Sequence, residues 1–474
     1  MLDKPPTAID PSLLARFAAI VGEKYAVTDP RAQAPYLVEP RDMFHGRTPM
    51  VLRPASVAEV AAILKLADET ATPVVPQGGN TGLVGGQIAL NNELVLSLTR
   101  LDRIREVDPT SNTITCEAGV TLQQACEAAA AVDRLYPQLL PSQGTCTIGG
   151  NLSTNAGGTA ALAYGTARAH VLGIEVVLAD GRILNDLNKL KKDNTGYDLK
   201  NLFIGAEGTL GVITAAVLRL VPRPRAVETA FVGVPSPEPA LALLDIAAQS
   251  AAGGVTSFEL MTRTGVEFVL RHAAGCRDPL SSPHPWYVLI ELSSQGKSGL
   301  REVMEDVLAQ GLQRGLVADA TIADSLEQAK AFWRIREMFG EVQRHEGGSI
   351  KHDVSVPVAA VPAFLKAADA AVAALIPGAR PIPFGHLGDG NIHYNVTQPL
   401  GADKADFLKR WDEVNAAVFA VVKKYGGSIS AEHGVGVVRR DLLPAVKDPV
   451  ALDLMRSLKR MLDPKNILNP GKVL

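Results

Sequence analysis

Histidine and carboxylate residues come together in two short glycine-containing segments near the C-terminal end of the chain. The first segment, 384–396, reads FGHLGDGNIHYNV, and its central turn signal predicts a hairpin that brings His386 near His393. The second, 428–436, reads SISAEHGVG and places Glu432 and His433 where a strand-like run enters a glycine turn. The whole chain has nine histidines, so this is an unusual concentration. Two histidines and a glutamate can bind a catalytic zinc or similar ion with open coordination positions.

Each of these pairs also has a simpler interpretation. His386 and His393 can be structural histidines that only form hydrogen bonds, and Glu432 and His433 can be surface residues. The residues alone leave both interpretations open.

A third segment, 332–357, contributes two cations. In it, WRIRE is typical of a helix, and SIKHDVSV is typical of a strand with Ser349, Lys351, Asp353 and Ser355 on one face. Arg336 and Lys351 can together hold a carboxylate, the arginine through two parallel hydrogen bonds and the lysine as a point charge. Taken singly, each is equally well explained as an ordinary surface charge.

Three glycine-rich turns occur earlier in the chain. Gly78–Gly82 (GGNTG) follows the strand-like run 73–76, and its backbone N–H groups can converge on an anion. The spacing differs from GxGxxG, which excludes a Rossmann interpretation and leaves a tight surface turn as the alternative. The uncharged stretch 141–158, PSQGTCTIGGNLSTNAGG, is rich in hydroxyls, amides and bare backbone, as expected around a large polar ligand. A third turn, 205–211, reads GAEGTLG.

The elements that position these residues alternate between strands and helices. VAEVAAILKLADET (57–70) and LQQACEAAAAV (122–132) predict helices, and ELVLSL, NTITCEAG, GIEVVLADG and GVITAAVLRLV predict strands. A boundary falls near 222–224, after which WYVLIEL predicts a strand and GLREVMEDVLAQGL a helix. The final helix is stopped at Asp463–Pro464. The pattern indicates an α+β protein of two domains.

Composition excludes several classes of protein. The chain has 474 residues with 47% hydrophobic and 20% charged residues, as in soluble globular proteins, and a net charge of −3 that suggests neither nucleic acid nor an anionic membrane as a partner. No run of about 18 apolar residues predicts a membrane span. The N-terminus does not resemble a targeting peptide. The four cysteines show no CxxC spacing, which argues against a disulfide framework, an iron–sulfur cluster or a cysteine-bound zinc and favours the cytoplasm.

Four motifs, PQGGNTGL, IGGNLSTNAGG, YGTARAHVLGIEVVLADG and FIGAEGTLGVIT, resemble in order and spacing the FAD domain of the vanillyl-alcohol oxidase (p-cresol methylhydroxylase) family, over about residues 50–222. The resemblance implies a two-subdomain FAD-binding domain of this type plus an α+β cap domain with an antiparallel sheet. It implies that Gly78–Gly82 holds the pyrophosphate and that 141–158 lines the isoalloxazine and ribityl chain. We expect non-covalent FAD, because the pyrophosphate loop has no His or Cys, and we interpret Cys146 as a buried thiol.

The resemblance also divides the chain and assigns its cofactor residues. We expect an N-terminal helical segment (1–49), the FAD domain (50–225), a cap domain with the metal site (226–440) and a C-terminal helix and tail that return to the FAD domain (441–474). The expected FAD-binding residues are Pro76, Gly78, Gly79, Asn80, Thr81, Gly82, Gly144, Thr147, Gly149, Gly150, Asn151, Thr154, Asn155, Gly157, Gly158, Gly208, Ile213 and Asn469.

The C-terminal segments resemble the D-2-hydroxyacid dehydrogenase branch of this family. That resemblance makes His386, His393 and Glu432 the metal ligands, most readily of Zn²⁺ and next of manganese or cobalt. It makes Asn395 a substrate contact and His433 both a substrate contact and the catalytic base.

The resemblance also bears on the substrate. Arg336 and Lys351 stand where the 2-hydroxyglutarate enzymes bind the distal carboxylate, so the oxidation of D-2-hydroxyglutarate to 2-oxoglutarate is the first expectation. A D-lactate dehydrogenase, a glycolate oxidase flavin subunit and a broad-specificity enzyme are alternatives. One departure is Gly340, where those enzymes tend to have a hydroxyl residue one turn after the arginine.

Three other functions share the FAD domain: an O₂-using oxidase, an ether-lipid synthase and a non-enzymatic FAD-binding scaffold. The combined GHLGDGNIH and SAEHG segments favour the dehydrogenase over all three. The expected partners are the small hydroxy acid, an external electron acceptor such as a quinone or an electron-transfer flavoprotein, and a second copy of the chain in a homodimer.

Overall fold

The computed structural model describes residues 9–474, which form two compact units. The first unit runs to Gly158 and includes Gly165–Arg223 and Glu432–Leu474, and the second comprises Thr159–Tyr164 and Pro224–Ala431. Residues 1–8, on which part of the targeting-peptide prediction depends, lie outside the described residues.

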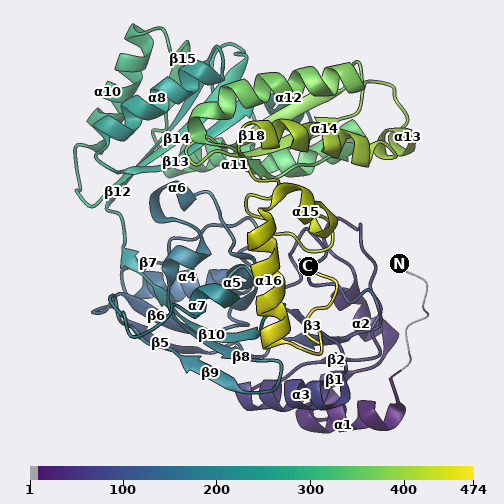
Figure 1. Ribbon diagram of the computed structural model, residues 1–474. Coiled ribbons are helices and arrows are strands. Elements are labelled where there is room, and N and C mark those ends of the chain that lie inside the picture. Colours follow the sequence, from purple (N-terminus) through teal and green to yellow (C-terminus); the bar gives the residue numbers. More distant parts are fainter. Residues whose placement is uncertain (1–8) are drawn as a thin grey trace. The chain divides into compact units, whose positions relative to one another are not determined.

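One half of the first unit is built on a four-stranded sheet in the order β1-β2-β4-β3 (Figure 1). Strands β2, β3 and β4 are parallel, and β1 pairs with β2 in the antiparallel sense. Helix α3 packs its apolar residues into the core of this half, and Ser56 caps its N-terminus by accepting from Glu59 N. The elements are α1 (Pro11–Val21), β1 (Ala26–Val27), α2 (Pro30–Leu37), β2 (Val51–Leu52), α3 (Val57–Thr70), β3 (Val74–Gln77) and β4 (Leu94–Ser97).

The other half of this unit is a five-stranded antiparallel sheet in the order β5-β6-β10-β8-β9. Seven of the eight residues of the central strand β10 are buried, as its nearly uninterrupted apolar sequence predicts. The elements are β5 (Ile104–Asp108), β6 (Thr113–Glu117), α4 (Leu122–Ala131), β7 (Arg134–Leu135), α5 (Ile148–Thr154), β8 (Val171–Val177), β9 (Ile183–Asp186), α7 (Lys200–Phe203), β10 (Val212–Arg219) and β11 (Val221–Pro222). The two sheets form the two subdomains predicted for this part of the chain.

The glycine-rich stretch 141–158 contains a helix, α5, that the sequence analysis did not predict. The Thr147 hydroxyl caps its first turn by accepting from Gly150 N, and Asn155 ends it in the left-handed conformation at φ +52°. Thr and Asn favour these two positions, so the local chemistry outweighs the poor helix propensity of Gly149 and Gly150.

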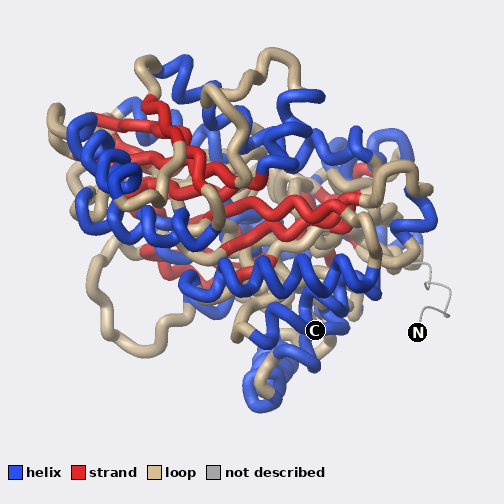
Figure 2. The backbone as a smooth tube through the Cα atoms, turned by 90° about the horizontal axis from the view of Figure 1, so that it is seen from above, coloured by secondary structure: helices blue, strands red, loops and turns tan. Residues whose placement is uncertain are grey.

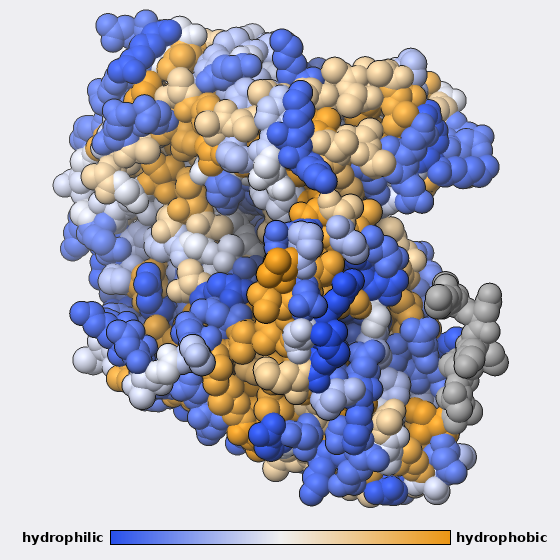
Figure 3. All heavy atoms as spheres, viewed as in Figure 1, coloured by the Kyte–Doolittle hydropathy of each residue, from blue (hydrophilic) through white to orange (hydrophobic). Residues whose placement is uncertain are grey.

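The first unit is completed by the C-terminal residues, which form α15 (Leu443–Val446), α16 (Pro449–Leu462) and a tail. Helix α16 ends at Asp463, as predicted. It buries Leu452, whereas Val450, Leu454 and Met461 are exposed. Apolar and charged residues therefore lie next to each other over α16 on the face drawn in Figure 3.

The second unit is built on an eight-stranded antiparallel sheet, which confirms the predicted cap architecture (Figures 1 and 2). The order is β15-β12-β14-β13-β18-β19-β16, with β17 also pairing with β19. Helices α8, α10, α12 and α14 pack on one side of the unit, while α9 and α11 pack on the face that presents Phe231, Met261 and Phe384.

The elements of the second unit are α6 (Ala161–Tyr164), β12 (Ala226–Val234), α8 (Pro237–Ser250), β13 (Val255–Thr262), α9 (Arg263–His272), β14 (Trp286–Ser294), α10 (Leu300–Gln313), β15 (Asp319–Ile322), α11 (Leu326–Val342), β16 (Ser349–Ile350), β17 (Val354–Ser355), α12 (Val361–Leu375), β18 (Arg380–His386), β19 (Asn391–Thr397), α13 (Lys404–Leu408) and α14 (Trp411–Lys424).

Two predicted strands are wrong. The segment SIKHDVSV forms two short strands, β16 and β17, because at His352 the backbone N–H donates to the Asn395 side chain (3.3 Å) and the ring Nδ1 lies 2.6 Å from Tyr394 O. These contacts take the chain out of the sheet at 351–353. The run 428–436 forms a single bridge, from Ser428 to Ser355, followed by turns.

One helical run, Val358–Leu375, is long and apolar enough to cross a membrane by length and composition, although no continuous apolar run had predicted a span. Its helix α12 packs on α14 and α8 within the second unit. Helices in the core of a folded protein can have the same length and apolar composition.

Candidate functional site

The predicted hairpin is present and brings its two histidines together. Strands β18 and β19 pair with His386 opposite Asn391 and Phe384 opposite His393. Because these residues alternate with their neighbours along the strands, Phe384, His386 and His393 share the face of the sheet that packs against α11. The centroids of the two imidazole rings are 5.9 Å apart.

A buried carboxylate on the neighbouring strand β13 holds two of the predicted site residues. Glu259 places Oε1 2.5 Å from His386 Nδ1, and its Oε2 accepts from Arg336 Nε at 2.6 Å. The Arg336 guanidinium also lies over the Phe384 ring, 4.8 Å from its centroid. A carboxylate on Nδ1 fixes the orientation of the ring, which is the usual arrangement around a metal-binding histidine.

The charge on Glu259 depends on these partners. Burial alone raises the pKa of this carboxyl group, but Arg336 and His386 outweigh burial and lower its pKa to about 2. The carboxylate is therefore ionised at neutral pH. Glu259 was not among the predicted site residues, although a single acid in the otherwise uncharged strand VTSFELMT indicates a paired buried carboxylate.

Lys351 lies beside the helix that carries Arg336. Its Nζ donates to Gly340 O at 2.9 Å, and Gly340 is one turn after Arg336 on α11. A Cβ atom at Gly340 would meet nothing within 4 Å, so the missing hydroxyl residue leaves open space. Arg336 is therefore on α11, and Lys351 contacts the same helix one turn later, at Gly340.

Asn395, the predicted substrate contact, is 3% exposed and lies in a network of amides. Its Nδ2 donates to Gln343 Oε1 at 3.1 Å, and its oxygen accepts from His352 N at 3.3 Å. On the same strand Asn391 donates to Asp353 Oδ1 at 3.0 Å. The amides of β19 thereby orient the loop 351–353.

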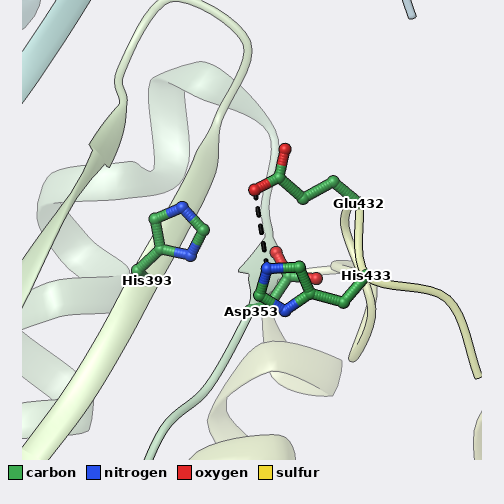
Figure 4. Close-up of side chains that lie close together, drawn as sticks. All are labelled: Asp353, His393, Glu432 and His433. Atoms are coloured by element: carbon green, nitrogen blue, oxygen red, sulfur yellow. Dashed lines mark ion pairs between the residues drawn. The ribbon is translucent and has the colours of Figure 1, made fainter. Parts of the chain in front are cut away.

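Four possible metal ligands gather in one group: Asp353, His393, Glu432 and His433 (Figure 4). One ligand atom from each lies within 4.8 Å of the others. The chain itself supports this placement, because Ala431 N donates to Asp353 O at 3.3 Å and Glu432 follows directly. Each side chain offers a carboxylate oxygen or an imidazole nitrogen, as a divalent metal requires.

This group overlaps with the predicted ligand set without matching it. His393 and Glu432 belong to it, Asp353 was not predicted as a ligand, and His386 lies outside it. The assignment of His386 to the metal remains a prediction. His433, the predicted base, has Nε2 3.7 Å from Glu432 Oε1, the pair joined by the dashed line in Figure 4.

A second buried acid fixes the loop that carries His433. In the first unit, Glu207 accepts from Val435 N at 2.6 Å and from Gly436 N at 2.9 Å. Its backbone carbonyl accepts from Asn469 Nδ2 at 2.8 Å, and its backbone N–H donates to Ser153 O. The sequence analysis also missed Glu207, although it stands between glycines in GAEGTLG. Glu207 therefore connects the His433 loop to three predicted cofactor segments: its own turn 205–211, the stretch 141–158 and the tail at Asn469.

Two glycine-rich loops of the first unit, 78–82 and 145–150, pack directly against each other. A Cβ at Gly78 would lie 2.4 Å from Thr147 Oγ1, and one at Gly79 would lie 1.9 Å from Thr145 O, so only glycine permits this approach. Asn80 donates to Pro35 O and Val38 O, and its buried Oδ1 has no partner among the described residues. An orphaned acceptor beside such a cradle fits a polar ligand.

Other predicted FAD-binding residues are engaged within the protein. Asn155 Oδ1 accepts from Thr166 Oγ1 and Arg168 N, and Thr154 Oγ1 donates to Gly150 O. Asn151 lies 3.6 Å from the sulfur of the buried Cys146.

The remaining glycines and backbone positions of this set shape the surroundings. Gly208 packs on Pro76, and Ile213 is buried in β10. A Cβ at Gly157 would lie 2.8 Å from Glu432 Oε2, so the end of the glycine-rich stretch lies against a predicted metal ligand within the same unit. The contacts of these residues with FAD remain predictions.

Two family models cover most of the chain. Residues 48–186 match the FAD binding domain, and residues 223–473 match the C-terminal domain of the FAD linked oxidases. The chain belongs to the FAD-linked oxidase family. It is therefore an oxidoreductase that uses FAD.

Several relatives resemble the chain over nearly its whole length. It is 37% identical to the mitochondrial D-2-hydroxyglutarate dehydrogenase of Arabidopsis thaliana, over 99% of this chain and 82% of that protein. It is 38% identical to the rat enzyme of the same name, over 99% of this chain and 86% of that protein. It is also 38% identical to D-2-hydroxyglutarate dehydrogenase of Xanthomonas citri pv. viticola, over 92% and 93%.

Solved structures agree on the fold. p-Cresol methylhydroxylase aligns with a TM-score of 0.77 at 16% identity, over 99% of this chain and 98% of that chain. Alkyldihydroxyacetonephosphate synthase aligns with a TM-score of 0.73 at 19% identity, over 98% and 87%. At such identities the likeness shows the fold alone.

Proposed function

We propose that this flavoenzyme oxidises a D-2-hydroxy acid to the 2-oxo acid, with D-2-hydroxyglutarate as the first candidate. The observation that carries the proposal is the Glu259 carboxylate, which holds Arg336 with one oxygen and His386 with the other. A cation suited to a distal carboxylate is thereby fixed beside the histidine hairpin. The names of the relatives support the same substrate.

We propose that a divalent metal, most readily Zn²⁺, completes the site. His393 and Glu432 supply two ligands, and Asp353 or His386 supplies a third. The mixed imidazole and carboxylate donors suit zinc, and also manganese or cobalt. When bound, this metal would polarise the hydroxyl group and the adjacent carboxylate of the substrate.

The chain's own residues supply binding and proton transfer in this proposal. Arg336 and Lys351 bind the distal carboxylate and fix which face of the reacting carbon is presented. His433 takes the proton of the substrate hydroxyl, because an imidazole titrates near working pH. Bound FAD would supply the acceptor for the hydride that leaves this carbon. The products are the 2-oxo acid and reduced flavin, so atoms and electrons balance.

A second candidate is a broader or smaller D-2-hydroxy acid. The open space at Gly340 favours it, because no side chain there narrows the pocket or hydrogen-bonds to a second carboxylate. Lys351 contacts the Gly340 carbonyl, so a hydroxyl residue at 340 would stand beside the lysine.

We propose that an external acceptor takes the electrons from the reduced flavin. We also propose that the protein is a cytoplasmic homodimer. A quinone or an electron-transfer flavoprotein is the first candidate acceptor. One relative, 35% identical over 90% of this chain and 87% of that protein, is the D-2-hydroxyglutarate–pyruvate transhydrogenase of Saccharomyces cerevisiae. Pyruvate is therefore included among the acceptors to be tested.

The decisive experiment mixes the purified protein anaerobically with D-2-hydroxyglutarate, D-malate, D-lactate, glycolate and the L-enantiomers while flavin absorbance is followed. Fast bleaching by the D-dicarboxylates alone supports the proposal. Bleaching mainly by D-lactate supports the second candidate and removes the role of Lys351. Failure of every acid to bleach the flavin would overturn both.

A matched pair of variants tests the carboxylate contact. Lys351→Met should raise KM for D-2-hydroxyglutarate by about 10- to 100-fold, the value of one charged hydrogen bond, and leave D-lactate unaffected. Lys330→Met, which removes an exposed lysine from the first turns of α11, should change neither.

A further inference from the structure

The C-terminal tail is held rigidly against α16 (Figure 1). The Asp463 carboxylate accepts from Ile467 N at 2.9 Å and Leu468 N at 2.8 Å, and Lys459 Nζ donates to Leu468 O at 2.8 Å. Asn469 N then donates to Val74 O, so the tail extends the edge of β3. The side chains that follow in the tail therefore have fixed positions.

A cavity of about 280 Å³ lies between this helix and the tail. Its lining includes four cationic side chains, Arg456, Lys459, Arg460 and Lys472, and one carboxylate, Asp463. Lys459 donates to Asp463 Oδ2 and to two backbone carbonyls, so these two charges neutralise each other. The other three cationic side chains have no acidic side chain as a partner among the lining residues.

Lys472 is more buried than Lys459, the other lysine of this cavity, and lacks the acceptors that Lys459 has. It is 2% exposed, and its ammonium has no hydrogen bond or ion pair within the described part of the chain. Glu93 acts on it only at longer range, and Arg440 repels it. An ammonium on a largely buried side chain is unfavourable without an acceptor, so an anion in the cavity that it lines would stabilise its charge. Burial lowers the pKa of Lys472, as expected for an ammonium that has no acceptor close enough to offset its desolvation.

We propose that Lys472, with Arg456 and Arg460 at the exposed side, binds a phosphate-type dianion in this cavity. A dianion matches the surplus of cations better than a single carboxylate, and guanidinium groups bind phosphate oxygens in pairs. The cavity has room for one or two phosphoryl groups. Arg456 and Arg460 are exposed and can admit an anion from solvent.

The phosphate group that binds in this cavity has two possible sources. One is the pyrophosphate of FAD, because Asn469, which also lines the cavity, donates to Gly86 O and Glu207 O beside the glycine turns of the same unit. The other is a free phosphate compound from solvent. The two sources differ in whether the site is already filled in the FAD-loaded protein.

The test measures binding of inorganic phosphate and pyrophosphate by calorimetry, at constant ionic strength, to the FAD-loaded protein and to the FAD-free protein. It compares the unaltered chain with Lys472→Gln. Lys447→Gln, which removes an exposed lysine near α16, is the control. FAD affinity of each FAD-free protein is measured by fluorescence quenching.

A free-phosphate site predicts binding to the FAD-loaded protein that Lys472→Gln weakens at least tenfold and Lys447→Gln does not. A cofactor site predicts no binding to the loaded protein, pyrophosphate binding to the FAD-free protein, and an at least tenfold loss of FAD affinity in Lys472→Gln. Lys472→Arg, which keeps the charge, should retain binding and guards against misfolding of the glutamine variant. Absence of anion binding in both forms, with FAD affinity unchanged by Lys472→Gln, overturns the proposal.

Discussion

Glu259 and His386 form a buried carboxylate–imidazole pair, with Oε1 2.5 Å from Nδ1, on adjacent strands of the cap sheet. The other oxygen of the carboxylate accepts from Arg336. One side chain therefore orients both a predicted metal ligand and a predicted substrate-binding cation, so damage to it should affect both functions together.

Replacing Glu259 with glutamine should lower kcat/KM for the substrate by about 10- to 100-fold, the usual cost of an outer-shell partner of a metal-binding histidine. The amide cannot neutralise Arg336 or fix the histidine tautomer. Glu291→Gln is a matched control, because Glu291 is a half-buried acid on the neighbouring strand that accepts a hydrogen bond from Trp333. Equal losses in both variants would show a general structural effect instead.

The stability of the protein should depend on the Glu259 charge in acid. Its pKa falls from an ordinary 4.5 to about 2 in the folded state, so the unfolded chain binds this proton first as pH falls. This contribution to stability is therefore complete above about pH 4.5 and is lost as the pH falls towards 2. Urea unfolding between pH 3 and 6 should show a steeper loss in the unaltered protein than in Glu259→Gln, and parallel curves would contradict the assignment.

Metal analysis can distinguish the two possible ligand sets. If Asp353 is a ligand with His393 and Glu432, then Asp353→Asn should lose bound metal while His386→Asn retains most of it. The set predicted from sequence gives the reverse result. Chelation of the unaltered protein should abolish turnover and added Zn²⁺ should restore it. Full turnover in a verified metal-free sample would remove the metal from the proposal.

His433→Ala should slow flavin reduction by substrate by at least about 100-fold, because it removes the imidazole proposed to take the hydroxyl proton. The flavin should stay bound, since the glycine cradle at 78–82 and 145–150 is unchanged. Stopped-flow absorbance measures the reduction, and the flavin spectrum reports cofactor retention. Reduction at the unaltered rate would disprove the role of His433 as the base.

Gly340 offers a test of both stability and specificity. A Cβ at this position meets open space inside α11, so Gly340→Ala should raise the free energy of unfolding by about 1 kcal/mol. Gly340→Thr adds a hydroxyl near Lys351 and should lower KM for D-2-hydroxyglutarate with little change for D-lactate. Thermal unfolding and steady-state kinetics measure the two effects. A higher KM for the dicarboxylate would place the pocket elsewhere.

Much of the fold could be predicted because its patterns are local. Helix α3 was predicted with its observed bounds from the apolar spacing of 57–70, and the β18–β19 hairpin from its glycine turn. The strand predicted across 349–355 failed because tertiary contacts of His352 replace its ladder bonds. Alternation of side chains alone could not reveal this.

The candidate site was only partly visible for the same reason. The histidines and Glu432 stand in conspicuous motifs, whereas Asp353, Glu207 and Glu259 acquire their roles from partners far along the chain. Glu259, for example, is 127 residues from His386. Pairing at such separations is set by the topology of the sheet, which single-sequence patterns do not fix.

The path of the chain between the two units has a consequence for biosynthesis. The chain passes from one unit to the other after Gly158, Tyr164, Arg223 and Ala431. The first unit is built from segments that precede and follow residues 224–431, because Asn469, which bonds Gly86 and Glu207, comes after them in the sequence. The earlier segments of the flavin domain therefore lack these bonds while residues 224–431 are synthesised, and a chain truncated between Ala431 and Asn469 should be unable to retain its flavin.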